Sequence, residues 1–547
     1  MLHPVRSFFR ISAVAALLVL GACAGSKPPP PSTDIDETAY REHLRVLSAD
    51  DFEGRRPASR GEDKTVAYLT EQFRKLGLKP LADKSYVQPV PLIESTPREA
   101  SVSTHGAQGV RRLEIGRDVL LQSASGEATI RLTESDLVFV GFGIVAPEYS
   151  WNDYAALDVR GKTVLVLAGD PGPAAKDPAL FHGANLTAYG RSEYKVEEAA
   201  RQGAAAILVV HEAGILGHGW EALRNQCRVP QFHLANAATT APVLQGWLSP
   251  EAAQRLFADA GADFTAASAA AAHPGAKAMA LGLRVDASLS QMVRPVTSNN
   301  VGAILPGDRK GEFIVFVAHW DSLGSDPSLA GHNVFNGTID NASGVAGLLT
   351  LAQSYVRTKP VAERSMVFLA TTGGLSGYLG STHYLKNPVL PLRQTAAVID
   401  LENLLPGGHS RDISIFDMGS SDLDESALAA ALLQGREAKA DPFPGLGLYY
   451  RSEAFVYAHS GIPALYAVSG VDNAARGPAY GMAQRQRFMA QVDAQPADQY
   501  AADGDVRGAL DDLGMYYEVG LRVARNHRFP RWRPNSEFRA RADAPAD

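Results

Sequence analysis

Three long apolar runs in the second half of the chain each end in polar or glycine residues. The run EFIVFVAHWD reaches His319 and Asp321, and the run TAAVIDLEN reaches Asp400 and Glu402. Between them, RSMVFLATTGG leads into a glycine-rich turn. Short apolar runs bounded by turn residues are typical of buried strands. We therefore predict strands whose carboxyl ends carry polar side chains, the place where open α/β sheets position ligands and chemistry.

Helical spacing alternates with these strands. Asp340 directly precedes the apolar segment NASGVAGLLTLAQSYV, and DVRGALDDLGMYYEVGLRVARN has the pattern of a final amphipathic helix. Near the N-terminus, GEDKTVAYLTEQFRKLG places apolar residues at near-helical spacing. Alternating strands and helices predict an α/β fold, with a mixed, mostly parallel sheet flanked by helices.

The segment 130–285 differs from the rest of the chain. It contains the strand patterns SDLVFVGFGIV and GKTVLVLAG, and YKVEEAARQGAAAILVVHE reads as a helix followed by a strand. We predict a β-rich domain at 130–285, inserted into a main domain formed by 36–130 and 285–535. Its GFG triplet is no nucleotide loop, because no glycine-rich helix start follows. The segment also contains four histidines, for which we expect loop or core positions and not a second metal site: His182, His211, His218 and His233.

The N-terminus has the pattern of a targeting segment. Arg6 and Arg10 precede the short apolar run ISAVAALLVL, and LGAC ends at Cys23. The run is too short to span a membrane and has signal-peptide flanks. A small-residue pair before Cys resembles the bacterial lipoprotein cleavage box. We expect a signal peptide at 1–22, lipidation of Cys23 and a proline-rich tether at 23–35; cleavage of an ordinary secretory signal near Ala24 is the alternative.

Composition narrows the class of protein further. The chain has 547 residues, of which 46% are hydrophobic, and this is enough for ordinary apolar cores. Its formal net charge of −7 does not indicate nucleic-acid binding, which is typical of basic proteins. Cys227 is the second of its two cysteines, so lipidation of Cys23 excludes an intramolecular disulfide. We expect a lipid-anchored protein of the cell envelope, on the periplasmic side of the outer membrane or at the cell surface.

The motifs AHWDSLG, NGTIDNASG, ATTGGLSGYLGS and DLEN together resemble the family-28 metallopeptidases, zinc aminopeptidases related to glutamate carboxypeptidase. The segment VFVGFGIVAPEYSWNDYAALDVRGKTVLVLAGDPG resembles the protease-associated domain common in that family. The resemblance implies the fold of these enzymes and a site for two zinc ions. It implies that His319, Asp340 and Glu402 bind one ion, and that Asp321 orients His319.

The second half of that family site is missing from this sequence. The general base falls on Gly374, and the ligands of the second ion fall on Leu375 and Ala494. A further family histidine falls on Ala454 in RSEA. We therefore expect at most one zinc ion. The alternative is a hydrogen-bonded polar cluster without metal.

Several polar residues near the motifs could replace what is lost. Asp493 is adjacent to the vacated histidine position, which makes it the first candidate for a shifted ligand among His332, Asp326, His383, His459 and Asp493.

Three functions remain open. The first, which we favour, is a catalytically inactive peptidase-fold lipoprotein that binds a peptide, a protein or an envelope component. The second is a metal-dependent aminopeptidase or exopeptidase with a single-metal or rearranged site. The third is a scaffold on which the inserted domain carries the function.

Overall fold

The computed structural model describes residues 35–175, 177–236, 242–360 and 362–539. These residues fall in one compact unit. The predicted signal peptide 1–22, Cys23 and nearly all of the tether 23–35 lie outside them. Within the described residues, no helix combines the length and the apolar character needed to cross a membrane.

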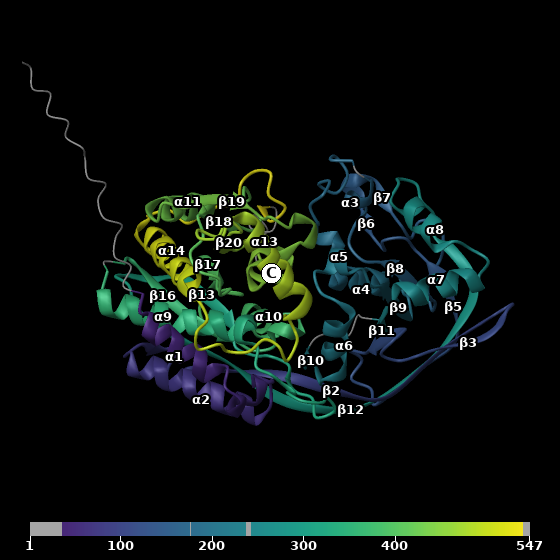
Figure 1. Cartoon of the computed structure of the whole chain (residues 1–547), viewed down its shortest axis with the longest axis horizontal. Helices are drawn as coiled ribbons and strands as arrows, with labels where there is room; N and C mark the ends of the chain where they lie inside the picture. The colour runs from purple at the N-terminus through teal and green to yellow at the C-terminus, as the bar shows by residue number, and fades with distance from the viewer. Residues whose placement is uncertain (1–34, 176, 237–241, 361, 540–547) are drawn as a thin grey trace, which may run out of the picture. The chain divides into compact units, whose positions relative to one another are not determined.

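The helices, shown in Figure 1, are α1 (Glu37–Leu47), α2 (Arg60–Lys75), α3 (Pro171–Ala175), α4 (Ser192–Arg201), α5 (Ala213–Leu216), α6 (Trp220–Arg228), α7 (Pro250–Asp259), α8 (Phe264–Ala271), α9 (Ser343–Thr358), α10 (Leu379–Lys386), α11 (Leu423–Leu433), α12 (Glu453–His459), α13 (Pro478–Gln491) and α14 (Arg507–Arg525).

The strands are β1 (Lys79–Pro80), β2 (Val87–Gly106), β3 (Gly109–Leu113), β4 (Val119–Gln122), β5 (Thr129–Phe139), β6 (Val145–Ala146), β7 (Trp151–Asn152), β8 (Thr163–Leu167), β9 (Ala206–Val210), β10 (Gln231–Leu234), β11 (Leu244–Leu248), β12 (Met279–Leu305), β13 (Arg309–His319), β14 (Gly324–Ser325), β15 (Val334–Phe335), β16 (Arg364–Thr371), β17 (Thr395–Asp400), β18 (Asp412–Ile415), β19 (Glu437–Ala440) and β20 (Ala464–Ser469).

A large sheet organises the chain, with the strand order β19-β18-β20-β17-β13-β16-β12-β5-β8-β9-β11-β4. Its centre is parallel, because β13 pairs in parallel with both β16 and β17, and β17 pairs in parallel with β20. Every residue of β16 and β17 is buried, which explains their continuous apolar sequences. Helices α9 and α14 pack on β13 and β16, and α12 packs on β17 and β20. The predicted α/β fold with a mostly parallel sheet flanked by helices is confirmed.

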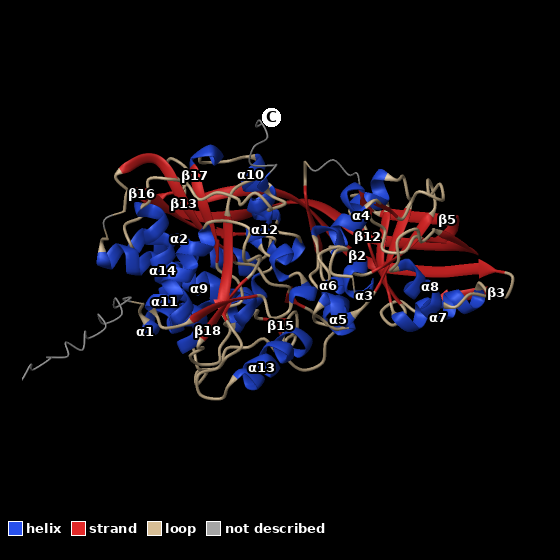
Figure 2. Cartoon of the chain, turned by 90° about the horizontal axis from the view of Figure 1, so that it is seen from above, coloured by secondary structure: helices blue, strands red, loops and turns tan. Residues whose placement is uncertain are grey.

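The large apolar cores along this sheet fall in two parts of the chain. The body, defined here by the core residues of 40–81 and 301–538, surrounds the central parallel strands. The insert, defined by the core residues of 102–289, surrounds β5, β8, β9 and β11. The long strands β2 and β12 pair antiparallel and run from one core to the other (Figure 2). The predicted domain limits stay a prediction.

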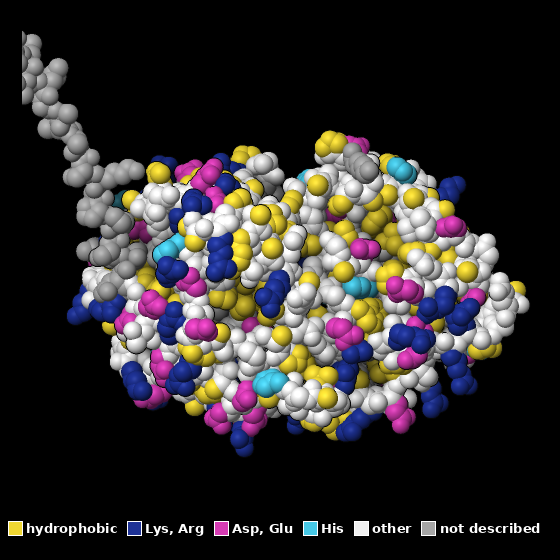
Figure 3. Space-filling model, viewed as in Figure 1, with side chains coloured by type: hydrophobic (Ala, Val, Ile, Leu, Met, Phe, Trp, Pro, Cys, Tyr) yellow, Lys and Arg dark blue, Asp and Glu magenta, His cyan; other side chains and the backbone are white. Residues whose placement is uncertain are grey.

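Charged side chains of both signs are mixed over the face drawn in Figure 3, with no broad patch of one sign.

A buried guanidinium joins the N-terminal helices of the body to the loops at the sheet end. Arg55 is 1% exposed and lies in the 3₁₀ segment η1 (Asp50–Arg55). It donates to the carbonyl oxygens of Trp320 at 2.8 Å and Gly337 at 2.9 Å, and to those of Leu47 and Asn336 at 2.6 Å. Burial lowers the pKa of Arg55 to about 10, although nearby carboxylates oppose this.

We predict that Arg55→Met lowers the free energy of unfolding by about 3 kcal/mol or more, because it leaves several buried carbonyl groups without donors. Urea unfolding measures this loss. Arg60→Met is the matched control, since Arg60 is 69% exposed and its one ion pair among the described residues is with Glu53 at the surface; we expect a change within about 0.5 kcal/mol. Equal losses in the two variants would contradict the role given to Arg55.

Candidate metal and ligand site

The structure brings together the three residues that the resemblance implies as ligands of one ion. His319 is the last residue of β13, Glu402 lies two residues beyond β17, and Asp340 lies in the helical turn η4 (Thr338–Ala342) before α9. Their ligand atoms lie within 4.8 Å of one another. His319 Nε2 is 3.1 Å from Asp340 Oδ1 and 3.9 Å from Glu402 Oε1. Because β13 and β17 are parallel neighbours, His319 and Glu402 lie at the same end of the sheet.

The segment around Asp340 is fixed by its own neighbours in the motif DNASG. Asn341 accepts a hydrogen bond from Gly344 N at 3.0 Å and donates to Leu401 O at 3.0 Å. A Cβ on Gly344 would lie 2.0 Å from Leu401 O, so only glycine allows the start of α9 to approach the end of β17 so closely. The motif therefore holds Asp340 beside Glu402.

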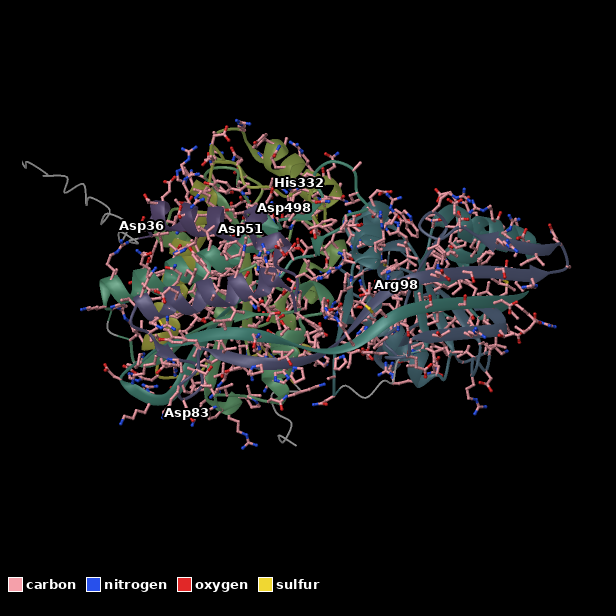
Figure 4. All side chains as sticks on the ribbon, turned by 90° about the horizontal axis from the view of Figure 1, so that it is seen from below. Asp36, Asp51, Asp83, Arg98, His332 and Asp498 are labelled. Carbon is pink, nitrogen blue, oxygen red and sulfur yellow. The ribbon has the colours of Figure 1, made fainter. Side chains whose placement is uncertain are left out.

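Asp498 holds the same segment from the other side, and the sequence analysis did not single it out. Its carboxylate accepts hydrogen bonds from Ile339 N at 2.9 Å and Asp340 N at 3.1 Å. Burial raises the pKa of Asp498 to about 7, against the lowering effect of these backbone bonds. Figure 4 labels Asp498 in the body, in the region where His332 is also labelled. No local sequence pattern marks a residue that binds backbone 159 positions away.

Asp321 contacts His319 on the side opposite the cluster. His319 Nδ1 lies 3.2 Å from the backbone oxygen of Asp321 and 3.5 Å from its carboxylate. The carboxylate also accepts a hydrogen bond from Gly374 N at 2.8 Å. Burial lowers the pKa of His319, but its bonds to Asp321 and Asp340 outweigh this and raise it well above its ordinary value.

Gly374, where the family resemblance implies the general base, has no room for a side chain. A Cβ built there would lie 2.2 Å from Cγ of His319 and 2.5 Å from its Nδ1. The glycine therefore packs directly against the imidazole ring. Any larger residue would displace either this turn or His319.

The two positions where the resemblance implies ligands of a second ion lie in one apolar cluster. Leu375 and Ala494 pack with Val229 of the insert and with Leu323 and Phe335 of the body. Where the resemblance implies a carboxylate and an imidazole, this chain has a small hydrophobic contact between insert and body. Asn225 of α6 strengthens it by donating to Ala494 O at 3.2 Å.

Of the replacement candidates, Asp493 lies beside Asp340. Burial and repulsion from Asp340 and Asp498 raise the pKa of Asp493 well above its ordinary value. The others have partners elsewhere or lie apart from His319: His332 contacts Asp50, Asp326 pairs with Arg228, His383 contacts Asn387, and His459 packs on Phe455.

Among the described residues, His182, His211, His218 and His233 take part in no cluster of possible metal ligands. The insert carries a different cluster on its surface, formed by His105, Glu134 and Asp286. Arg284 pairs with Glu134 there.

Further polar residues around the site were missed by sequence reasoning. The Tyr378 hydroxyl donates to Arg451 O and lies 3.4 Å from Glu402 Oε1. Arg451 in turn donates to the carbonyl oxygens of Leu216 and Ile215 in the insert. A chain of contacts thus links the insert to Glu402. The motif RSEA contains Arg451, but nothing in the motif indicates that its side chain binds backbone in the insert.

Glu453, also in RSEA, lies in a second buried carboxylate group with Asp400. It accepts hydrogen bonds from Thr371 and Ser381 at 2.5 and 2.6 Å, and Asp400 accepts one from Ala454 N at 2.8 Å. Burial and repulsion from Glu453 raise the pKa of Asp400 well above its ordinary value. Ala454, where the resemblance implies a histidine, contributes its backbone N–H to this contact, so the contact does not depend on the side chain at that position.

The ligand set suits a cation of the zinc class. One imidazole and two carboxylates are donor types that zinc accepts, and three protein ligands are usual where an open position remains. Glu402 is 5% exposed, and its Oε2 has no hydrogen-bond partner among the described residues. Burial, followed by repulsion from Asp400, raises the pKa of Glu402 well above its ordinary value; a bound cation would oppose that rise.

Comparison with known proteins agrees with this geometry. A family profile, Peptidase family M28, matches residues 300–501. The search of curated proteins found no match. Among solved structures, the aminopeptidase from Aneurinibacillus sp. strain AM-1 is 18% identical with a TM-score of 0.52, and the match covers 94% of this chain and 98% of that one.

Two other structures were found with lower scores. A zinc aminopeptidase from Bacillus subtilis is 17% identical, with a TM-score of 0.47 and coverage of 92% of this chain and 97% of that one. A peptidase M28 precursor from Shewanella amazonensis is 16% identical, with a TM-score of 0.48 and coverage of 92% and 99%. Together, the family profile and the Aneurinibacillus structure show that residues 300–501 match peptidase family M28 and that the chain has the fold of the Aneurinibacillus aminopeptidase.

Proposed function

We propose that this chain is a peptidase-fold protein that binds one zinc ion through His319, Asp340 and Glu402 and binds peptides without hydrolysing them. The observation that carries the proposal is the apolar cluster at Leu375 and Ala494. An apolar contact between insert and body stands where a second ion would need charged ligands. The ligand is a peptide, or a protein or envelope component that presents one.

The ion would be held by side chains that the fold already aligns. Zinc would supply a Lewis acid that polarises a carbonyl oxygen. Asp321 keeps His319 oriented with Nε2 toward Asp340, and Asp498 and Asn341 keep the Asp340 segment in place. These residues position a ligand carbonyl rather than move a proton.

The absence of a base at position 374 supports binding over hydrolysis. General base catalysis is typically worth about 100-fold to 10,000-fold, which corresponds to about 3–5 kcal/mol of barrier. Gly374 contributes no side chain, and His319 occupies the space that one would need. Among the replacement candidates, Asp493 is the residue that lies beside Asp340.

Asp493 supports a second candidate function, a single-metal or rearranged aminopeptidase. It lines the same cleft as Asp340 and Glu402, so its carboxylate could take a proton from water there. In this reading Asp493 acts as the base, and hydrolysis depends on both the ion and Asp493.

The place of action is part of the same proposal. The sequence pattern that predicts a signal peptide at 1–22 and lipidation of Cys23 supports a lipid anchor at the cell envelope, where a peptide-binding protein would meet extracytoplasmic ligands. A scaffold role for the insert remains the third reading, and binding by the insert alone would favour it.

We predict about one zinc ion per purified chain and none in His319→Ala, because the imidazole is the only nitrogen ligand of the cluster. Elemental analysis measures the zinc content. We expect an aminoacyl-anilide assay run in parallel to detect no zinc-dependent turnover. One ion with turnover that disappears in Asp493→Asn would establish the rearranged peptidase instead. Two ions would show that other residues complete the second site, and no ion would leave the three residues a structural polar cluster.

We predict that Gly374→Glu restores no turnover and destabilises the fold by about 1–3 kcal/mol, the usual cost of overpacking. The cause is the contact between the new Cβ and the His319 ring. Thermal unfolding and the anilide assay measure both effects. Gly407→Glu is the control for adding a glutamate, since a Cβ at Gly407 meets nothing within 4 Å. Turnover gained by Gly374→Glu would mean that the base position is still open.

A further inference from the structure

A cleft of about 600 Å³ lies where the insert and the body meet. Asp340 and Glu402 line it from the body, and Glu193 and Glu197 line it from α4 of the insert. Glu402 is 5% exposed and its Oε2 has no hydrogen-bond partner among the described residues. The cleft therefore connects the residues proposed to hold the ion with the acidic residues of α4, and a pocket with a few convergent polar groups is where a ligand binds.

The carboxylates of Glu193 and Glu197 are available to such a ligand. Both are exposed and lie one helical turn apart on α4, so they share a face of that helix. Among the described residues, neither forms an ion pair with a lysine, arginine or histidine. The other ionisable groups of α4 are engaged, since Lys195 donates to Phe142 O and Glu198 pairs with Arg201.

The arginines near this acidic pair are held by other contacts. Arg451 is the cation whose pKa Glu193 affects, but its guanidinium donates to the backbone of Ile215 and Leu216. The guanidinium of Arg191 lies over the ring of Phe455, 4.4 Å from its centroid. These two arginines therefore do not pair with Glu193 or Glu197, which leaves both carboxylates open to a cationic ligand.

The opposite wall suits the stem of a long basic side chain. Leu385, Leu448 and Val456 of the body line the same cleft. Lysine and arginine bury their methylene stems along apolar surface while the charged end reaches a polar partner. Lys386 on α10 also lines the cleft and forms no ion pair among the described residues, so it opposes basic ligands.

We propose that this cleft selects peptides with a positively charged side chain, and that Glu193 and Glu197 bind that charge. The proposal rests on the peptide binding proposed above and adds the ligand class. The metal ligands hold the backbone of the peptide, and α4 selects the side chain. The insert is then the part of the chain that determines specificity.

The test compares labelled pentapeptides that differ only at the central residue, Gly-Ala-Lys-Ala-Gly and the same peptide with norleucine. Norleucine keeps the four-carbon stem of lysine without its charge. Fluorescence anisotropy with the full-length, zinc-loaded protein in detergent gives the two affinities. We expect tighter binding of the lysine peptide, and an advantage that shrinks as salt rises.

The variant Glu193→Gln/Glu197→Gln should bind the lysine peptide about threefold to tenfold more weakly, the range of one or two exposed charge pairs. Its affinity for the norleucine peptide should not change, which separates charge recognition from loss of fold. Lys386→Gln is the opposite-sign control and should bind the lysine peptide equally or more tightly.

Equal binding of the two peptides by the wild-type protein would overturn the specificity and leave peptide binding standing. A double variant that weakens both peptides alike would also overturn it, because the glutamates would then act on the fold. Failure of every peptide to bind, with zinc present, would overturn the proposed function itself and this inference with it.

Discussion

The buried guanidinium of Arg55 is the constraint on which the site depends. It donates to carbonyl groups on three separate segments: the end of α1, the residue after His319, and the turn before Asp340. A charged group in the interior is tolerated only if its hydrogen bonds are satisfied. The same bonds that satisfy Arg55 fix the distance between the two loops that carry His319 and Asp340. Stability and site geometry therefore share one set of contacts.

Around His319 the balance of charge is unusual. Carboxylates outnumber cations in this buried region, and burial with mutual repulsion raises the pKa values of Asp400, Glu402 and Asp493. The imidazole responds in the opposite direction to its own burial, because Asp321 and Asp340 favour its charged form. Such an arrangement is costly in a core built only for stability. It is understandable at a site that binds a cation.

The sequence predicted the parts of this picture that have local patterns. Strand ends are visible as apolar runs, so His319 and Glu402 could be placed at one end of the sheet, and DNASG placed Asp340 before a helix. Arg55, Asp498 and Arg451 could not be found in this way. Their partners are backbone groups, which any residue supplies, and they lie 265, 159 and 235 positions away. At Gly374 the sequence predicted only that the general base of the family is missing. It could not predict that the glycine packs directly against the ring of His319.

The positions where the family resemblance implies ligands of a second ion take part in the packing between insert and body. Leu375 and Ala494 contact Val229, and Asn225 binds the backbone beside them. This apolar cluster packs the insert against the body, while Arg451 and Tyr378 connect the insert to Glu402. Charged side chains buried at this position would be costly unless a bound ion compensated their charge. If the second metal site is absent, as we propose, the apolar contacts that stand at its expected ligand positions also pack the insert against the body.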